Sequence, residues 1–167
     1  MKSAALLLTL LPLGACGLHP LYAGGGSGAV AIALTGVDVA PIEGRGGWLV
    51  ANALRDRLGA GSGGGSSARF RLDVRLDDQI RGLGVRRDDS VARERRTLRA
   101  RYQLVDLATS AVLLDTTTGS DAGIDVVGSE YATIAAENTA QERLAGIVAD
   151  QIVGRLALYA RTHAVSR

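Results

Sequence analysis

The side chains best suited to binding a ligand in this sequence are arginines concentrated in one stretch. Eight of the chain's 18 arginines lie between positions 81 and 101, namely Arg81, Arg86, Arg87, Arg93, Arg95, Arg96, Arg99 and Arg101. A guanidinium group offers a planar fork of donors that can bind phosphate or carboxylate with two hydrogen bonds. Asp88, Asp89 and Glu94 can pair with some of them. The stretch is therefore either an anion-binding surface or a solvated, partly self-paired strand face.

Residues for catalysis or metal binding are sparse. His19 lies near the start of the chain and His163 near its end, so neither falls in the spacing of a catalytic triad or a metal site. The glycine runs lack the lysine of a phosphate-binding loop. These patterns predict a protein with no enzymatic activity and no metal or other cofactor. A formal net charge of only +2 and an aromatic content of 4% argue against nucleic acid as a partner.

The only cysteine, Cys16, ends an apolar run that follows a positively charged start at Lys2. The run is too short to span a bilayer, which needs roughly 20 apolar residues, and it has the length typical of a signal peptide. Its end, Leu13-Gly14-Ala15-Cys16, resembles the lipobox of bacterial lipoproteins. The resemblance implies cleavage before Cys16, with diacylglycerol on the thiol and an acyl chain on the new amino group. The alternative is an ordinary secretory signal that happens to contain a cysteine.

The signal divides the chain into three predicted parts. Residues 1–15 form the lipoprotein signal peptide, residues 16–28 a lipidated start and flexible glycine-rich linker, and residues 29–167 a single domain. A domain of this size can form its own hydrophobic core.

Hydrophobic periodicity predicts the elements of this domain. Alternating or β-branched patterns predict strands at 29–39, 68–80, 91–106 and 112–118, and three-to-four spacing predicts helices at 46–58 and 129–161. Glycines 82 and 84 are expected in a turn, and residues 119–128 in a loop. The order βαβββα predicts an α+β fold, a two-layer sandwich. Its four-stranded, mostly antiparallel sheet is covered on one face by the two helices.

The same patterns predict which side chains are buried. In strand 68–80, Phe70, Leu72, Val74 and Leu76 share one face, and in strand 91–106 Leu98, Ala100, Tyr102 and Leu104 do the same. Arg93, Arg95, Arg99 and Arg101 lie on the opposite face. The apolar stripe of the second helix is expected to run from Ile134 through Val148 and Ile152 to Leu156 and Tyr159. Trp48 is expected at the edge of the core, and Ser129 as a helix cap.

Three segments together resemble one known family. They are Cys16-Gly17-Leu18-His19-Pro20-Leu21-Tyr22, then Arg101-Tyr102-Gln103-Leu104-Val105-Asp106, and the helix with Tyr131-Ala132 and Ala135-Ala136-Glu137. In these the chain resembles the lipopolysaccharide-assembly lipoproteins of the LptE family, in their alphaproteobacterial form. The resemblance implies a protein that plugs the lumen of the LptD outer-membrane β-barrel and helps assemble it, and that binds lipopolysaccharide during its transport to the outer leaflet. Gly17, where an aspartate would hold the protein at the inner membrane, implies a lipid anchor in the outer membrane.

Lipopolysaccharide carries phosphates, so the resemblance suggests a role for the arginine stretch. We predict that Arg86, Arg87, Arg93, Arg95 and Arg96 bind lipopolysaccharide. Acidic groups of the barrel wall are an alternative ligand for them. Two other functions remain open from the sequence: an auxiliary lipid- or protein-binding lipoprotein of an ABC-type lipid transport system, and a structural lipoprotein that tethers the envelope.

Overall fold

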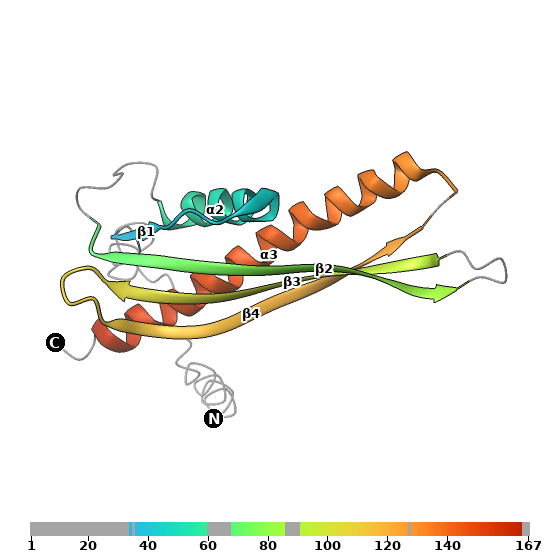
Figure 1. Ribbon diagram of the computed structural model, residues 1–167. Helices are drawn as coiled ribbons and strands as arrows, with labels where there is room; N and C mark the ends of the chain where they lie inside the picture. The colour runs from blue at the N-terminus through green and yellow to red at the C-terminus, as the bar shows by residue number, and fades with distance from the viewer. Residues whose placement is uncertain (1–33, 35, 60–67, 86–90, 127, 165–167) are drawn as a thin grey trace, which may run out of the picture.

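The computed structural model describes residues 34, 36–59, 68–85, 91–126 and 128–164. Cys16, Arg86 and Arg87 lie outside the described residues. The described elements are β1 (Val37–Val39), α2 (Gly44–Leu58), β2 (Phe70–Val85), β3 (Val91–Asp106), β4 (Val112–Asp125) and α3 (Glu130–Ala164). The strands form one sheet in the order β1-β2-β3-β4, in which β1 is parallel to β2 and the other pairs are antiparallel (Figure 1).

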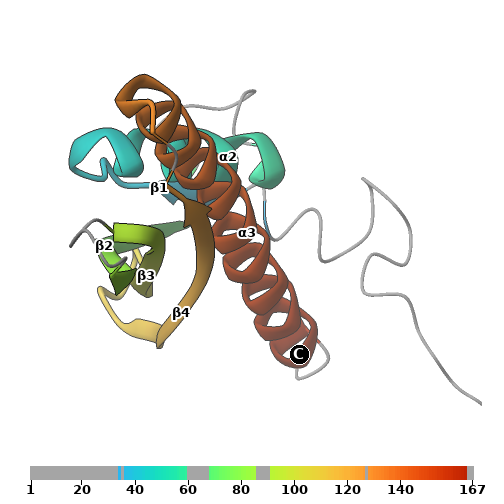
Figure 2. The ribbon, with the colours of Figure 1, turned by 90° about the vertical axis from the view of Figure 1, so that its right-hand side faces the viewer.

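The two helices lie on the same side of this sheet (Figure 2). Helix α3 runs along β3 and β4, and α2 packs against α3. This arrangement confirms the predicted α+β fold with the order βαβββα. None of the helices in the described ranges is long and apolar enough to cross a membrane.

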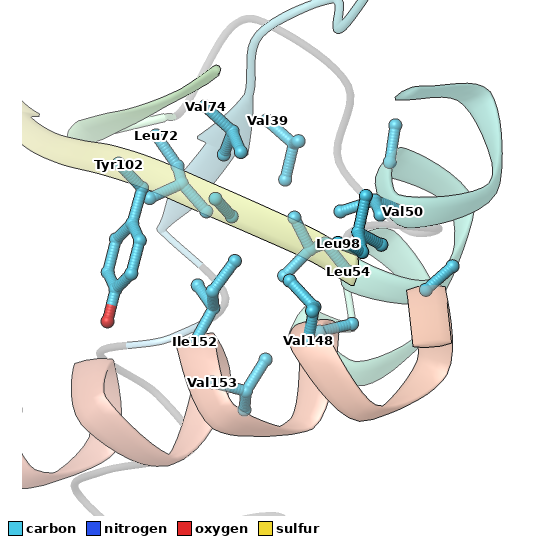
Figure 3. Close-up of a cluster of buried hydrophobic side chains, with 14 of the residues drawn as sticks. Val39, Val50, Leu54, Leu72, Val74, Leu98, Tyr102, Val148, Ile152 and Val153 are labelled. Carbon is cyan, nitrogen blue, oxygen red and sulfur yellow. The ribbon is translucent and has the colours of Figure 1, made fainter. Parts of the chain in front are cut away.

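One hydrophobic core joins the sheet to both helices (Figure 3). From the strands it takes Leu72, Val74, Leu98, Ala100, Tyr102 and Leu104, and from the helices Val50, Leu54, Val148, Ile152 and Leu156. Full burial of one such aliphatic side chain contributes roughly 1.5–3 kcal/mol relative to its exposure. The predicted inward faces of the strands at 68–80 and 91–106, and the stripe Val148–Leu156, are thereby confirmed.

Two strands are longer than their sequences suggested. Strand β2 continues through Gly82 and Gly84 to Val85, where a turn was expected, and β4 continues to Asp125, through most of the expected loop. Both extensions pair with β3, whose Val91 faces Val85 and whose Arg93 faces Asp125. The ladder hydrogen bonds of a long partner strand thus outweigh the low strand propensity of glycine and aspartate.

Other details of the prediction were wrong. Trp48 is 62% exposed rather than at the core edge, because the inward face of α2 carries Val50, Leu54 and Leu58. Ile134 is 47% exposed, because the burial of α3 begins only at Ala140.

The predicted strand at 29–39 is a strand only at Val37–Val39, with Leu34 helical and residues 29–33 and 35 outside the described part. The expected cap of α3 is present. The hydroxyl oxygen of Ser129 accepts a hydrogen bond from the Ala132 N–H at 3.4 Å.

Candidate functional site

The face of the sheet opposite the helices carries alternating charged side chains, and we call it the charged face. No described helix covers it. Because side chains alternate along a strand, one residue in two points to this side. Its charged members are Arg71, Asp73, Arg75, Asp77, Arg81, Arg93, Arg95, Arg99, Arg101, Asp115, Asp121 and Asp125.

Near the β3–β4 turn these charges neutralise one another. Arg101 donates two hydrogen bonds to Asp115, at 3.2 and 2.9 Å, and Gln103 donates a third at 2.8 Å. The hydrogen bonds from Arg101, and then from Gln103, lower the pKa of the Asp115 carboxyl below its ordinary value. Arg71 is likewise held by Asp73 at 2.9 Å. The donors of Arg71 and Arg101 are therefore largely used here, whereas Arg75, which stands opposite Arg101 on β2, forms no ion pair with any described residue.

At the other end, where β2 leads toward β3, the positive charges of the arginines are less well neutralised by acidic side chains. Arg93 donates to Asp125 at 2.9 Å, but the Arg95 guanidinium lies 3.8 Å from the Asp121 carboxylate. Arg81 stands directly opposite Arg95 on β2, and its own hydrogen bond goes to the uncharged Gln79 at 2.9 Å. Like charges that face each other across two strands destabilise the pair. An anion bound between them would remove this repulsion.

Arg99 lies on the same face, and a glycine makes room for it. Its neighbour on β4 is Gly119. A Cβ atom at position 119 would lie 2.9 Å from the Leu98 carbonyl oxygen and 3.1 Å from Cγ of Arg99. The Arg99 side chain therefore passes close over the backbone of β4, which only glycine permits. Its guanidinium forms no ion pair with any described residue.

Arg96 points the other way, into the helix layer. It donates to both carboxylate oxygens of Asp78, at 2.8 and 2.7 Å, and to the carbonyl oxygen of Glu137 at 3.0 Å. Gln141 on α3 donates to the same carboxylate at 2.9 Å. Burial by itself raises the pKa of Asp78, but the hydrogen bonds from Arg96 and Gln141 outweigh it and lower that pKa. We call these four residues the Arg96 cluster.

The structure thus separates the arginines that the sequence grouped. Arg93 and Arg95 lie together on the charged face, whereas Arg96 is only 9% exposed and binds β2 and α3. Alternation could have revealed this, because position 96 has the same parity as the inward residues Leu98 and Ala100. Arg81 and Arg99, which were not among the predicted ligands, share the face with Arg93 and Arg95.

The Arg96 cluster has an acidic neighbour. Burial and the adjacent Glu137 carboxylate raise the pKa of Glu94, and the Oε2 atom of Glu94 has no hydrogen-bond partner among the described residues.

Within the described ranges, no three His, Cys, Asp or Glu side chains gather in a group that could hold a metal ion.

Comparisons with known proteins agree with this fold. A family model described as LptE, lipopolysaccharide-assembly, matches residues 34–156. No curated protein matches the sequence. The chain is similar to the crystal structure of a protein described as a lipoprotein from Caulobacter crescentus CB15, with 27% sequence identity. The two structures superpose with a TM-score of 0.65, and the match covers 81% of this chain and 98% of the Caulobacter chain.

Two more distant structures share the fold. Lipoprotein B from Nitrosomonas europaea is 12% identical, with a TM-score of 0.57 over 76% of this chain and 88% of its own. Rare lipoprotein B from Shewanella oneidensis is 10% identical, with a TM-score of 0.54 over 78% and 97%. The family match spans the sheet and most of both helices. The chain therefore belongs to the LptE family of lipopolysaccharide-assembly proteins.

Proposed function

We propose that this protein is an outer-membrane lipoprotein that fills the lumen of the LptD β-barrel and binds lipopolysaccharide on its way to the outer leaflet. The observation that carries the proposal is the family match over residues 34–156. In this proposal Cys16 is the lipid attachment site, and the partners are the barrel, lipopolysaccharide and, through the acyl chains, the outer membrane. Several acyl chains on one residue anchor a protein stably, at about 0.8 kcal/mol for each buried methylene.

The distribution of polar surface supports a place inside a barrel. The lumen of a large outer-membrane barrel is polar, so a plug has to present polar side chains to its wall. Here the apolar faces of the sheet and helices meet in one core, and the charged face points outward. Its arginines and aspartates can pair either with the barrel wall or with a glycolipid.

The end of the charged face around Arg81 and Arg95, where like charges face each other across the strands, is the best candidate for contact with lipopolysaccharide phosphates. There Arg93 and Arg95 are well exposed, with 64% and 57% of their side chains accessible. Arg86 and Arg87 follow β2 in the chain and complete the proposed set. A phosphate that replaces Asp121 as the partner of Arg95 accepts a charge-assisted hydrogen bond from it. The negative charge of the phosphate also reduces the repulsion between Arg95 and Arg81. Arg96 is left out of the proposal, because its donors are used inside the domain.

The test reverses the two exposed charges. We expect Arg93→Glu with Arg95→Glu to weaken binding to purified lipopolysaccharide by about 100-fold or more, because two charged hydrogen bonds worth roughly 1.5–3 kcal/mol each are lost. Binding should also weaken as salt rises, since exposed charges are screened. The matched control is Arg155→Glu, an exposed position on α3. Thermal unfolding of all variants should change little, because exposed substitutions usually cost within about 0.5 kcal/mol.

Lipopolysaccharide binding and contact with the barrel wall can be told apart in this experiment. If the double variant binds lipopolysaccharide like the wild type but loses co-purification with the barrel, the arginines serve the protein interface. If neither changes, the charged face is only a solvated surface.

For the anchor, Cys16→Ser should leave the protein unprocessed or free of the membrane. Mass spectrometry that finds an unacylated mature terminus downstream of Cys16 in the wild type would exclude it as the attachment site.

A further inference from the structure

A pocket opens between strand β2 and the segment that leads from β1 to α2. Its volume is about 870 Å³, within the roughly 300–1,000 Å³ that is typical of sites for small ligands. Its lining includes Pro41, Ile42, Glu43, Val74, Arg75 and Arg101. Arg93 and Arg95 do not line it, so the pocket is separate from the proposed phosphate contacts.

The pocket begins where the hydrogen-bond ladder between β1 and β2 stops. The Ala40 N–H donates to the Leu72 carbonyl at 3.1 Å, and the Phe70 N–H donates to the Gly36 carbonyl at 3.0 Å. Even-numbered residues of β2 therefore turn their backbone groups toward this side. The Val74 N–H comes next in the series, but it has no acceptor among the described residues. Backbone donors inside a folded protein need a partner, so this N–H is available to a ligand in the pocket.

Arg75 supplies a free positive charge. It stands directly opposite Arg101 on β3, and like charges in this position destabilise a pair of strands. The Arg101 guanidinium is held by Asp115 at 2.9 Å, whereas Arg75 is exposed and forms no ion pair with any described residue. A ligand with an acidic group would satisfy the Arg75 donors and reduce the repulsion.

Glu43 supplies an acceptor on the other side of the pocket. It is exposed, precedes the first residue of α2 without a side-chain cap hydrogen bond, and forms no ion pair within the described ranges. Asp73, the other acidic lining residue, is already bound by Arg71 at 2.9 Å. A ligand here therefore meets one free cation, one free carboxylate and the apolar surface of Pro41 and Ile42.

We propose that this pocket binds an acidic sugar, a hexuronic acid or a related sugar acid within an oligosaccharide. The planar guanidinium of Arg75 binds the sugar carboxylate with two hydrogen bonds. Sugar hydroxyls both donate and accept, so they can donate to the Glu43 carboxylate and accept from the Val74 N–H. The C–H face of the ring packs on Pro41 and Ile42. A simple anion would use Arg75 alone and would be repelled by Glu43.

This inference rests on the proposed function, because lipopolysaccharide is a glycolipid whose saccharide often carries acidic sugars. Arg75 and Arg81 are six residues apart on β2, which is about 20 Å at ~3.4 Å per residue. The pocket and the phosphate contacts around Arg81 and Arg95 would therefore hold different parts of one ligand.

Saturation-transfer difference NMR of the full-length protein in detergent tests the ligand class. Methyl glucuronide should bind at least about tenfold more tightly than methyl glucoside, its neutral counterpart, because a charged hydrogen bond is worth roughly 1.5–3 kcal/mol. Arg75→Gln should remove this preference. Arg99→Gln is the matched control and should keep it, because Arg99 is an exposed arginine of the charged face without an ion pair to a described residue, and it does not line the pocket.

Glu43→Ala distinguishes a sugar acid from a simple anion. Loss of the negative charge should strengthen the binding of inorganic phosphate, whereas loss of the hydroxyl acceptor should weaken the binding of methyl glucuronide by about threefold or more. Thermal unfolding should change little, because Glu43 makes no cap hydrogen bond to α2.

Three results would each overturn the proposal. They are equal affinity for the glucuronide and the glucoside, equal effects of Arg75→Gln and Arg99→Gln, and tighter glucuronide binding by Glu43→Ala. None of these measurements contains lipopolysaccharide, so the sugar pocket and the charge reversal at Arg93 and Arg95 can fail independently.

Discussion

Replacing Arg96 by methionine should destabilise the domain far more than replacing a neighbouring arginine. Methionine keeps the aliphatic part of the side chain but removes two hydrogen bonds to Asp78 and one to the Glu137 carbonyl. Removing one partner of a buried ion pair costs about 3–5 kcal/mol, because the other charge stays buried without compensation. Asp78 keeps its bond from Gln141 and its side chain is 22% exposed, so we expect the lower end, about 3 kcal/mol.

Urea unfolding of the purified protein measures this loss. Domains of this kind have total stabilities of about 5–15 kcal/mol, so the change should shift the midpoint clearly. Hydrogen exchange should rise in the first turns of α3, which Arg96 holds through the carbonyl of Glu137. Arg99→Met is the matched control. That arginine is exposed on the same strand, and its loss should cost within about 0.5 kcal/mol.

A second substitution isolates the unpaired charge as the cause. Asp78→Asn keeps an acceptor for Gln141 but removes the negative charge. The double variant with Arg96→Met should therefore be more stable than Arg96→Met alone. If Arg96→Met costs no more than Arg99→Met, or if the double variant is the less stable, the Arg96 cluster does not stabilise the domain as argued.

The stability difference between the wild type and Arg96→Met should change with pH in one direction. The pKa of Asp78 is lowered in the folded protein, so its contribution to stability is present above the unfolded value of about 3.9. This contribution is lost as the pH falls through the lower folded pKa. The difference between wild type and Arg96→Met should thus be full at neutral pH and shrink in strong acid.

Three further substitutions test the core and the strands. Leu156→Asp buries an unpaired carboxylate at a position 2% exposed and should abolish the cooperative thermal transition, whereas Leu158→Asp, at 38% exposure, should not. Gly119→Ala forces a Cβ to 2.9 Å from a backbone oxygen and should lower the unfolding free energy in urea by about 1–3 kcal/mol. Glu94→Gln should raise the melting temperature at neutral pH, because it removes the cost of burying the Glu94 charge and its repulsion from Glu137. Its advantage should shrink as the pH falls through the raised pKa of Glu94, where the native carboxyl is already protonated.

Outcomes that contradict these arguments are simple to recognise. Equal melting of the two leucine variants would refute the packing of α3 on the sheet. A Cβ atom at position 123 would meet no described neighbour within 4 Å, so Gly123→Ala should be much milder than Gly119→Ala. Equal losses in these two variants would exclude the close contact as the cause. A pH-independent effect of Glu94→Gln would show that the variant does not act by removing the negative charge of Glu94.

The sequence by itself determined the elements whose signal is local. Strand β3 begins and ends where its alternation predicted, at Val91 and Asp106, and Leu98 and Tyr102 are buried as expected. Helix α2 ends at Leu58 as predicted, followed by Gly59 in a left-handed conformation with φ of 70°. These features follow from the periods of the strand and the helix and from the freedom of glycine, which act over a few residues.

Only the tertiary structure decided the length of β2 and β4 and the partners of the arginines. Gly82 and Gly119 are strand residues because β3 supplies a ladder along their whole length, and no local pattern reports the length of a partner. Alternation places Arg96 on the inward side, but Asp78 and Gln141 reach it from 18 and 45 positions away in the chain, through β2 and α3. Which charges are neutralised and which are free depends on distances between strands, and these exist only after the chain has folded.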